Sequence, residues 1–120
     1  YSKSDVLDIL KELAKEAYIL VNQLEAFEKV LVDGNNISGY KAVAESYNKM
    51  LHRAKELMKI DGTFLGSINH LCNYDPNLEY GYASEYTQIR VSVPVLKGAL
   101  HTFCSYYLPA NEKEKIGFRA

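Results

Sequence analysis

The feature that most constrains the fold is a heptad-spaced run of apolar residues near the start of the chain. Alternating steps of four and three residues separate Val6, Leu10, Leu13, Ala17, Leu20, Leu24, Phe27 and Leu31. This spacing places side chains on one face of an α-helix. Ser4 is the predicted N-cap and Gly34 the predicted end of this helix. A seam of about seven turns needs other helices to cover it, which favours an all-α fold.

A second amphipathic helix is predicted after the turn of residues 34–39, with Ser38 as its cap. Its seam repeats steps of three and four residues: Tyr40, Val43, Tyr47, Met50, Ala54 and Leu57. The short connection predicts an antiparallel hairpin with the first helix. The two helices are oppositely charged, with a net charge of −3 over residues 1–33 and +3 over residues 38–60. Exposed ion pairs between them would stabilise the hairpin only slightly.

A shorter third helix is predicted over Thr63–Asn73. Its apolar face consists of Phe64, Leu65, Ile68, Leu71 and Cys72. The following segment, residues 75–82, contains Pro76 and Gly81 and is predicted to be a loop.

The last long element begins after Ser84, its predicted cap, and ends before Pro109. Its seam again has steps of four and three residues: Ile89, Val93, Leu96, Leu100, Phe103 and Tyr107. Pro94 interrupts the pattern, because proline removes one helical hydrogen bond and clashes with the preceding turn. Two solutions exist: a helix kinked at Pro94, or an extended segment over residues 86–93 followed by a helix. We prefer the kinked helix, because a single strand would have no pairing partner.

The predicted fold is therefore an all-α, antiparallel four-helix bundle with two long amphipathic helices, one short helix and a C-terminal helix kinked at Pro94. Residues 1–110 are expected to form one domain, and residues 111–120 a polar C-terminal tail. The seam of the first helix is longer than the third helix can cover. Either the fourth helix or a second copy of the chain covers the remainder, and we expect a homodimer.

Composition narrows the possible functions. Hydrophobic residues make up 48% and charged residues 24% of the 120-residue chain, which is typical of a globular domain. The net charge of −1 argues against nucleic acid as a partner, and the basic face of the second helix is interpreted as solvated. No run is long enough to span a bilayer, so no membrane partner is expected. The two cysteines are too few for a disulfide framework, and a cytoplasmic location is predicted.

Two histidines and two cysteines are the candidate ligand or metal residues: His70, Cys72, His101 and Cys104. In principle four such side chains can hold zinc. However, His70 and Cys72 are two residues apart and would point in different directions from one helix. His101 and Cys104 share a helix face, which permits a cysteine nucleophile with a histidine base. A buried, inert Cys104 is the preferred interpretation, and no cofactor is predicted.

Tyrosine is the unusual component, with ten tyrosines and no tryptophan. The predicted interaction surface is a cluster in and around the 75–82 loop: Tyr74, Tyr80, Tyr82 and Tyr86. Tyrosine combines rigid contact area with a polar tip, which suits protein interfaces. The preferred hypothesis is a non-catalytic helical module that binds a protein partner or itself. The alternatives are a small-ligand or metal-binding bundle and, as the least favoured, a cysteine-dependent enzyme.

Overall fold

A computed structural model describes residues 3–33 and 39–108 of the chain. Of these residues 81% are helical and none lies in a strand, so the all-α prediction is confirmed. There are two long helices at the start, a short one and a last long one: α1 (Lys3–Asp33), α2 (Tyr40–Met58), α3 (Gly62–Ile68) and α4 (Ala83–Tyr107). The predicted tail lies outside the described residues.

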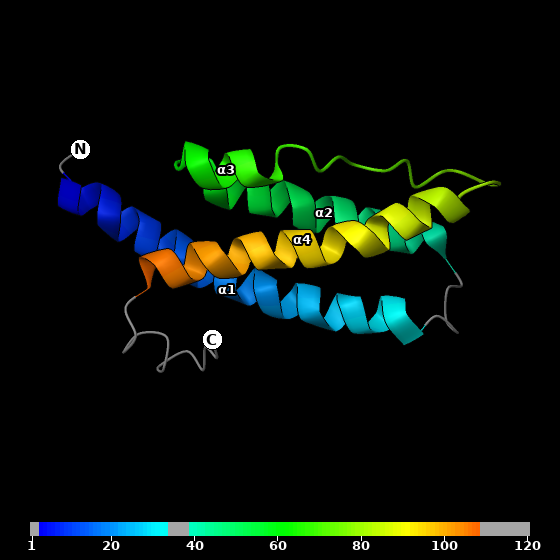
Figure 1. Cartoon of the computed structure of the whole chain (residues 1–120), viewed down its shortest axis with the longest axis horizontal. Coiled ribbons are helices and arrows are strands. Elements are labelled where there is room, and N and C mark those ends of the chain that lie inside the picture. The colour runs from blue at the N-terminus through cyan, green and yellow to red at the C-terminus, as the bar shows by residue number, and fades with distance from the viewer. Residues whose placement is uncertain (1–2, 34–38, 109–120) are drawn as a thin grey trace.

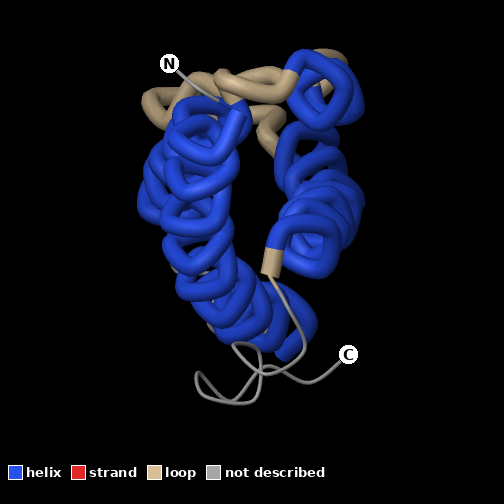
Figure 2. Tube along the Cα trace, turned by 90° about the vertical axis from the view of Figure 1, so that its left-hand side faces the viewer, coloured by secondary structure: helices blue, strands red, loops and turns tan. Residues whose placement is uncertain are grey.

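The helices form an elongated antiparallel bundle (Figure 1). Both α2 and α4 run opposite to α1, and α3 lies at one end of the bundle beside α2. Residues 69–82, which we call the connection, return along one edge of the molecule to the start of α4 (Figures 1 and 2). A short helix and a long irregular segment therefore occupy the place that a third long helix would take in the bundle.

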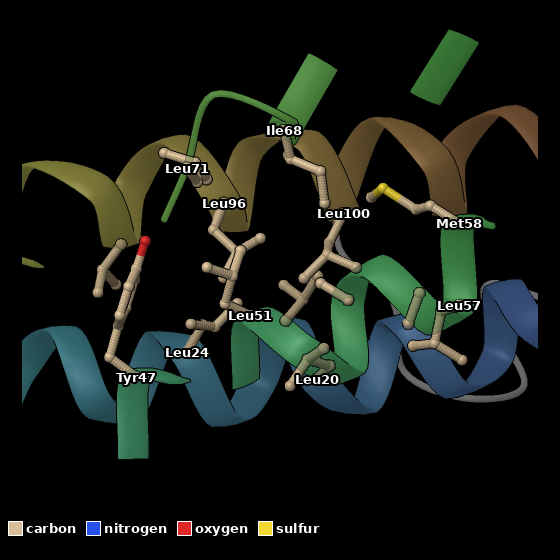
Figure 3. Packing of buried hydrophobic residues seen from close by; sticks show 14 of the residues in the cluster. Leu20, Leu24, Tyr47, Leu51, Leu57, Met58, Ile68, Leu71, Leu96 and Leu100 are labelled. Atoms are coloured by element: carbon tan, nitrogen blue, oxygen red, sulfur yellow. The ribbon is translucent and has the colours of Figure 1, made fainter. Parts of the chain in front are cut away.

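Most of the core comes from the predicted seams, together with residues beside them such as Ala44, Leu51 and Met58, while the seam residues Val43 and Met50 are only half-buried. Leucines from several elements interdigitate at its centre (Figure 3). Leu24, Leu51 and Leu96, from α1, α2 and α4, are all fully buried. The most extensive contact between helices is that of α1 with α4. Helix α3 contacts α2 and α4 but not α1, so the α1 seam is covered by α4 and α2 of the same chain. The seam of α1 thus gives no reason to invoke a second copy.

Helix α4 is continuous through Pro94, so the preferred of the two alternatives for residues 86–93 is confirmed. Pro94 lies on the exposed side of the helix. A missing amide donor is tolerated there, because the freed carbonyl of Arg90 can be hydrated. On the inner side, the buried Ser92 hydroxyl donates to the carbonyl oxygen of Gln88 (2.7 Å).

Several predicted helix ends are wrong. Ser4 and Ser84 lie inside their helices and not at their N-caps; Tyr82 is the residue before α4. The third helix ends at Ile68 and not at Asn73, which leaves Cys72 exposed outside it. Gly66 and Ser67 are poor helix formers. Leu71 is still buried, but it belongs to a turn in which its own amide donates to the carbonyl oxygen of Ile68 (3.0 Å). The predicted end at Gly34 and cap at Ser38 lie outside the described residues.

Candidate functional site

The connection is held on α2 by side chains that bond to its backbone. Asn48 donates from Nδ2 to the carbonyl oxygen of Tyr74 (2.8 Å) and accepts at Oδ1 from the Tyr74 amide (2.9 Å). Two turns further along α2, the Lys55 ammonium donates to the carbonyl oxygen of Leu71 (3.0 Å). These bonds satisfy backbone groups that a helix or sheet would otherwise pair. They explain why the segment is extended without belonging to a sheet.

Tyr40, the first residue of α2, fastens the other end of the connection. Its hydroxyl donates to the carbonyl oxygen of Asp75 (2.8 Å). Its ring stacks on the ring of Tyr82, with centroids 4.8 Å apart. Between these contacts Gly81 has a φ of 70°, a left-handed conformation that glycine adopts without steric cost. The stack positions the chain for the start of α4.

The four tyrosines of the predicted interaction surface are placed very differently. Tyr80 is 88% exposed, whereas Tyr86 is buried and donates from its hydroxyl to the carbonyl oxygen of Leu31 (3.4 Å). Tyr82 is half-buried in the stack described above. Tyr74 is half-buried against Tyr47, with ring centroids 5.8 Å apart. Most of this tyrosine cluster therefore packs inside the molecule, and Tyr80 is its one fully open member.

Beneath the connection lies a group of polar side chains between α2 and α4, which we call the polar layer: Tyr47, Tyr74, Glu85 and Ser92. Tyr47 is fully buried, and its hydroxyl has no hydrogen-bond partner. Ser92 is close to it, but directs its own hydroxyl to the helix backbone. Oxygen Oε2 of Glu85 is also buried without a partner. Each of these atoms needs an explanation, because most buried polar side-chain atoms have a hydrogen-bond partner.

The phenols around this layer are unsuited to act as bases near neutral pH. Burial raises the pKa of Tyr40, Tyr47 and Tyr74 above the ordinary value of 10.0. The nearby Glu85 carboxylate raises the pKa of Tyr40 and Tyr74 further, because it disfavours a second negative charge. These hydroxyls therefore remain protonated and can serve as hydrogen-bond donors.

The four candidate ligand residues occupy different environments. Cys104 is fully buried in α4, and its thiol donates to the carbonyl oxygen of Ala14 (3.2 Å). His101 is half-buried, while His70 and Cys72 are exposed beyond the end of α3. In residues 3–33 and 39–108, no three His, Cys, Asp or Glu side chains are grouped so that they could hold a metal ion. The structure thus offers no support for treating these residues as one site.

At the opposite end of the bundle, Asp61 links α3 to α4. Its Oδ1 accepts from the amides of Thr63 (3.0 Å) and Phe64 (3.3 Å), which caps α3. Its Oδ2 accepts a hydrogen bond from the hydroxyl of Tyr107. Burial, and then this bond to Asp61, raise the pKa of Tyr107 well above its usual value. The rings of Phe64 and Tyr106 lie beside this link, with centroids 5.7 Å apart.

The outward side of α4 carries no charge over its whole length. We call it the outer stripe, and its members are all exposed: Ser84, Thr87, Gln88, Val91, Pro94, Val95, Gly98, Thr102 and Tyr106. Val91 is 59%, Val95 42% and Tyr106 72% exposed. Arg90, at the edge of the stripe, is the one charged residue among the exposed positions of α4. This surface was not predicted from the sequence, because Pro94 and its neighbours were considered only as the site of a possible kink.

The exposed side of α2 provides the contrast. It is charged along its length, with Lys41, Glu45, Lys49, Arg53 and Glu56 all exposed. A helix with one buried and one solvated face normally shows this pattern. The outer stripe therefore differs from the exposed side of α2 in having no charged residue.

A shallow groove of about 280 Å³ runs along the edge of the outer stripe, between α4 and α1. Its walls are Glu28, Leu31, Thr87, Arg90, Val91 and Pro94. Glu28 is held in place by an ion pair with Lys97 (2.9 Å). The groove and the stripe together form a continuous surface on one side of the molecule.

Comparisons of the chain with known protein families, with curated proteins and with solved structures found no match. Among the described residues, no helix is both long enough and apolar enough to cross a membrane.

Proposed function

We propose that this chain is a non-catalytic helical interaction module, and that the outer stripe of α4 is its contact surface. The partner is a protein that presents an apolar helix face to the stripe. The observation that carries the proposal is the outer stripe itself, which has no charged member and in which Val91 and Val95 lie open to solvent. We place its activity in the cytoplasm, where two free thiols such as those of Cys72 and Cys104 persist.

The residues of the stripe also suit a helix–helix contact in shape. Gly98 is exposed, and a Cβ atom added there would meet nothing within 4 Å. A facing helix can therefore approach closely at this point. The valines on one side of Gly98 supply apolar area, and Tyr106 on the other side supplies a rigid amphipathic ring. Tyr80 lies on a different part of the chain and is not required by this proposal.

The test is a comparison of partner binding between the native chain and the double variant Val91→Glu/Val95→Glu. Two carboxylates in the centre of the stripe would have to be desolvated on binding, so we expect binding to fall at least about tenfold. Ser46→Glu, at an exposed position of α2, is the matched control for added charge. Binding that is equally strong in all three proteins would refute the assignment of the stripe.

We also propose a second candidate function, uptake of a small polar ligand at the polar layer. It is favoured by the unpaired Tyr47 hydroxyl and Glu85 Oε2, which need hydrogen-bonding partners. Native mass spectrometry of protein purified without chelators tests this function, and elemental analysis of the same sample would detect metal. A bound mass that Tyr47→Phe and Glu85→Gln both remove would support it. The bare mass of the chain would contradict it.

A further inference from the structure

We infer that a groove between α1 and α2 binds a free medium-chain fatty acid. The groove has a volume of about 450 Å³, within the range of about 300–1,000 Å³ that is usual for small-molecule sites. It lies between two helices of a bundle, which is a common position for such sites. The groove is separate from the outer stripe of α4 and from the polar layer.

The floor of the groove is apolar and accessible. It is formed by Ala26, Phe27 and Val30 of α1 together with Met50 of α2. Phe27 and Met50 belong to the predicted helix seams but are only half-buried, and Val30 is 56% exposed. Helix α3 does not cover these side chains, because it makes no contact with α1. A ligand with an apolar chain would therefore remove apolar surface from water at this place.

The polar residues of the groove indicate the charge of the ligand. Gln23, Ser46 and Lys49 are all exposed, and Lys49 is the one charged residue that lines the groove. In residues 3–33 and 39–108, no carboxylate lies within ion-pair distance of the Lys49 ammonium. Arg53, one turn further along α2, is by contrast paired with Glu16 of α1 (2.9 Å). The single positive charge of the groove is thus complementary to one carboxylate on a ligand.

The antiparallel arrangement of α1 and α2 sets the direction of the ligand. Gln23 comes first among the α1 residues of the groove, and Lys49 lies near the end of its α2 residues. These two side chains therefore share one end of the groove, and Val30 lies at the other. The carboxylate of the ligand accepts hydrogen bonds from the Lys49 ammonium and the Gln23 amide. Its alkyl chain extends over Phe27 towards Val30.

The length of the groove favours a small molecule over a protein. From residue 23 to residue 30, α1 advances about 10 Å at 1.5 Å per residue. An extended chain advances about 3.5 Å for every three bonds, so about nine carbon–carbon bonds span this length, as in decanoate. A protein interface normally covers about 800 Å² on each partner. Exposed charged residues adjoin the lining residues in sequence and confine the apolar floor: Glu25, Lys29 and Glu45.

Titration of the full chain with decanoate, followed by the chemical shifts of backbone amides in NMR spectra, tests the inference. A shallow groove leaves one side of the ligand in water. We therefore expect saturable binding of one molecule per chain, with a Kd between about 0.1 and 1 mM. The amides that shift should be those around Phe27 and Lys49. Decylammonium should bind at least about tenfold more weakly, because its charge has the same sign as that of Lys49.

Two variants with matched controls test the two ends of the groove. Lys49→Gln removes the positive charge and should weaken decanoate binding about three- to fivefold. Lys41→Gln, at an exposed position of α2 outside the groove, should leave it unchanged. Val30→Glu should weaken binding at least about tenfold, because it places a carboxylate beside the alkyl chain. Val91→Glu, at an exposed position of α4, should have no effect.

Circular dichroism of each variant checks that the helices are retained. Three outcomes would overturn the inference: no saturable binding of decanoate, shifts confined to amides outside the groove, or equal binding by the native chain and Val30→Glu. Equally strong binding of decylammonium would refute the role assigned to Lys49. None of these outcomes bears on the proposed function, which depends on Val91 and Val95 of α4.

Discussion

The hydroxyl of Tyr47 is enclosed in the core without a hydrogen-bond partner. The hydroxyl of Tyr40, two turns earlier on the same face of α2, is bonded to the carbonyl oxygen of Asp75. Both tyrosines are buried and both belong to α2. The two differ in what their hydroxyl groups contribute to the free energy of unfolding. An unpaired buried hydroxyl has lost its hydrogen bonds to water and gained none in return. A bonded hydroxyl has exchanged a bond to water for one within the protein.

We therefore predict opposite effects for two matched substitutions. Tyr47→Phe should leave the free energy of unfolding unchanged or raise it by up to about 1 kcal/mol, because it removes an unsatisfied group. Tyr40→Phe should lower it by about 0.5–1.5 kcal/mol, because the Asp75 carbonyl loses its donor. Urea denaturation of both variants measures the difference. A clear loss of stability in Tyr47→Phe would indicate that this hydroxyl has a bound partner, which would support the ligand hypothesis.

Tyr107 allows a prediction of pH dependence. Its pKa is raised in the folded state, so above the ordinary value of 10.0 the folded chain binds more protons than the unfolded chain. Stability supplied by the protonated phenol is fully present below that value and is lost as the pH rises towards the folded pKa. The free energy of unfolding should therefore fall above about pH 10, and the fall should be shallower in Tyr107→Phe.

The control for this prediction is Tyr80→Phe, which removes a hydroxyl from an exposed ring. Tyr40, Tyr47 and Tyr74 also have raised pKa values and should supply the remaining alkaline dependence in Tyr107→Phe. An identical slope in the native chain and in Tyr107→Phe would contradict the role assigned to the bond with Asp61.

Among the elements, the connection depends most on tertiary contacts. Its backbone is bonded to Asn48 through both a donor and an acceptor. We predict that Asn48→Ala lowers the free energy of unfolding by about 1–3 kcal/mol, because two hydrogen bonds are lost and the Tyr74 backbone is left unpaired. Hydrogen exchange should then increase at the Tyr74 amide before it increases in α1. Ser46→Ala, at an exposed site on the same helix, is the control and should change neither quantity.

Helix α4 retains a proline where most helices would exclude one. Pro94→Ala restores an amide that can donate to the carbonyl of Arg90, and its side chain lies on the exposed side. We predict that the substitution raises the free energy of unfolding by about 1–3 kcal/mol. Thermal unfolding followed by circular dichroism measures it. A destabilised variant would mean that the proline sets a bend that the packing of α4 on α1 requires.

For the whole molecule, the buried thiol of Cys104 can be used to test whether the bundle unfolds cooperatively. Its thiol lies between α4 and α1, the pair with the largest contact, whereas Cys72 is exposed. In the native chain we predict fast alkylation of Cys72 and protection of Cys104. Protection of Cys104 should be lost at the same urea concentration as helicity, because α1, α2 and α4 share one core. Earlier loss would show that α4 separates from α1 before the bundle unfolds.

The helices themselves could be predicted from the sequence, because the signal for a helix is local. The seams of α1 and α2 recur at three and four residues, and their members are buried or half-buried as this spacing predicts. The same periodicity in α4 outweighed Pro94, since the inward residues Val93 and Leu96 continue the seam on both sides of it. Helix ends were less predictable, as Ser4 and Ser84 show, because several residues near each end can serve as caps.

What the sequence by itself determined about this protein is its secondary structure class and the inward face of each long helix, since both follow from residue spacing along the chain. Tertiary structure alone decided that α4 covers the seam of α1 and that side chains of α2 hold the 69–82 connection extended. It also decided that Tyr86 is buried while Val91 is exposed. These outcomes depend on which elements meet in space, and contacts between residues far apart in the chain leave no periodic trace in either partner.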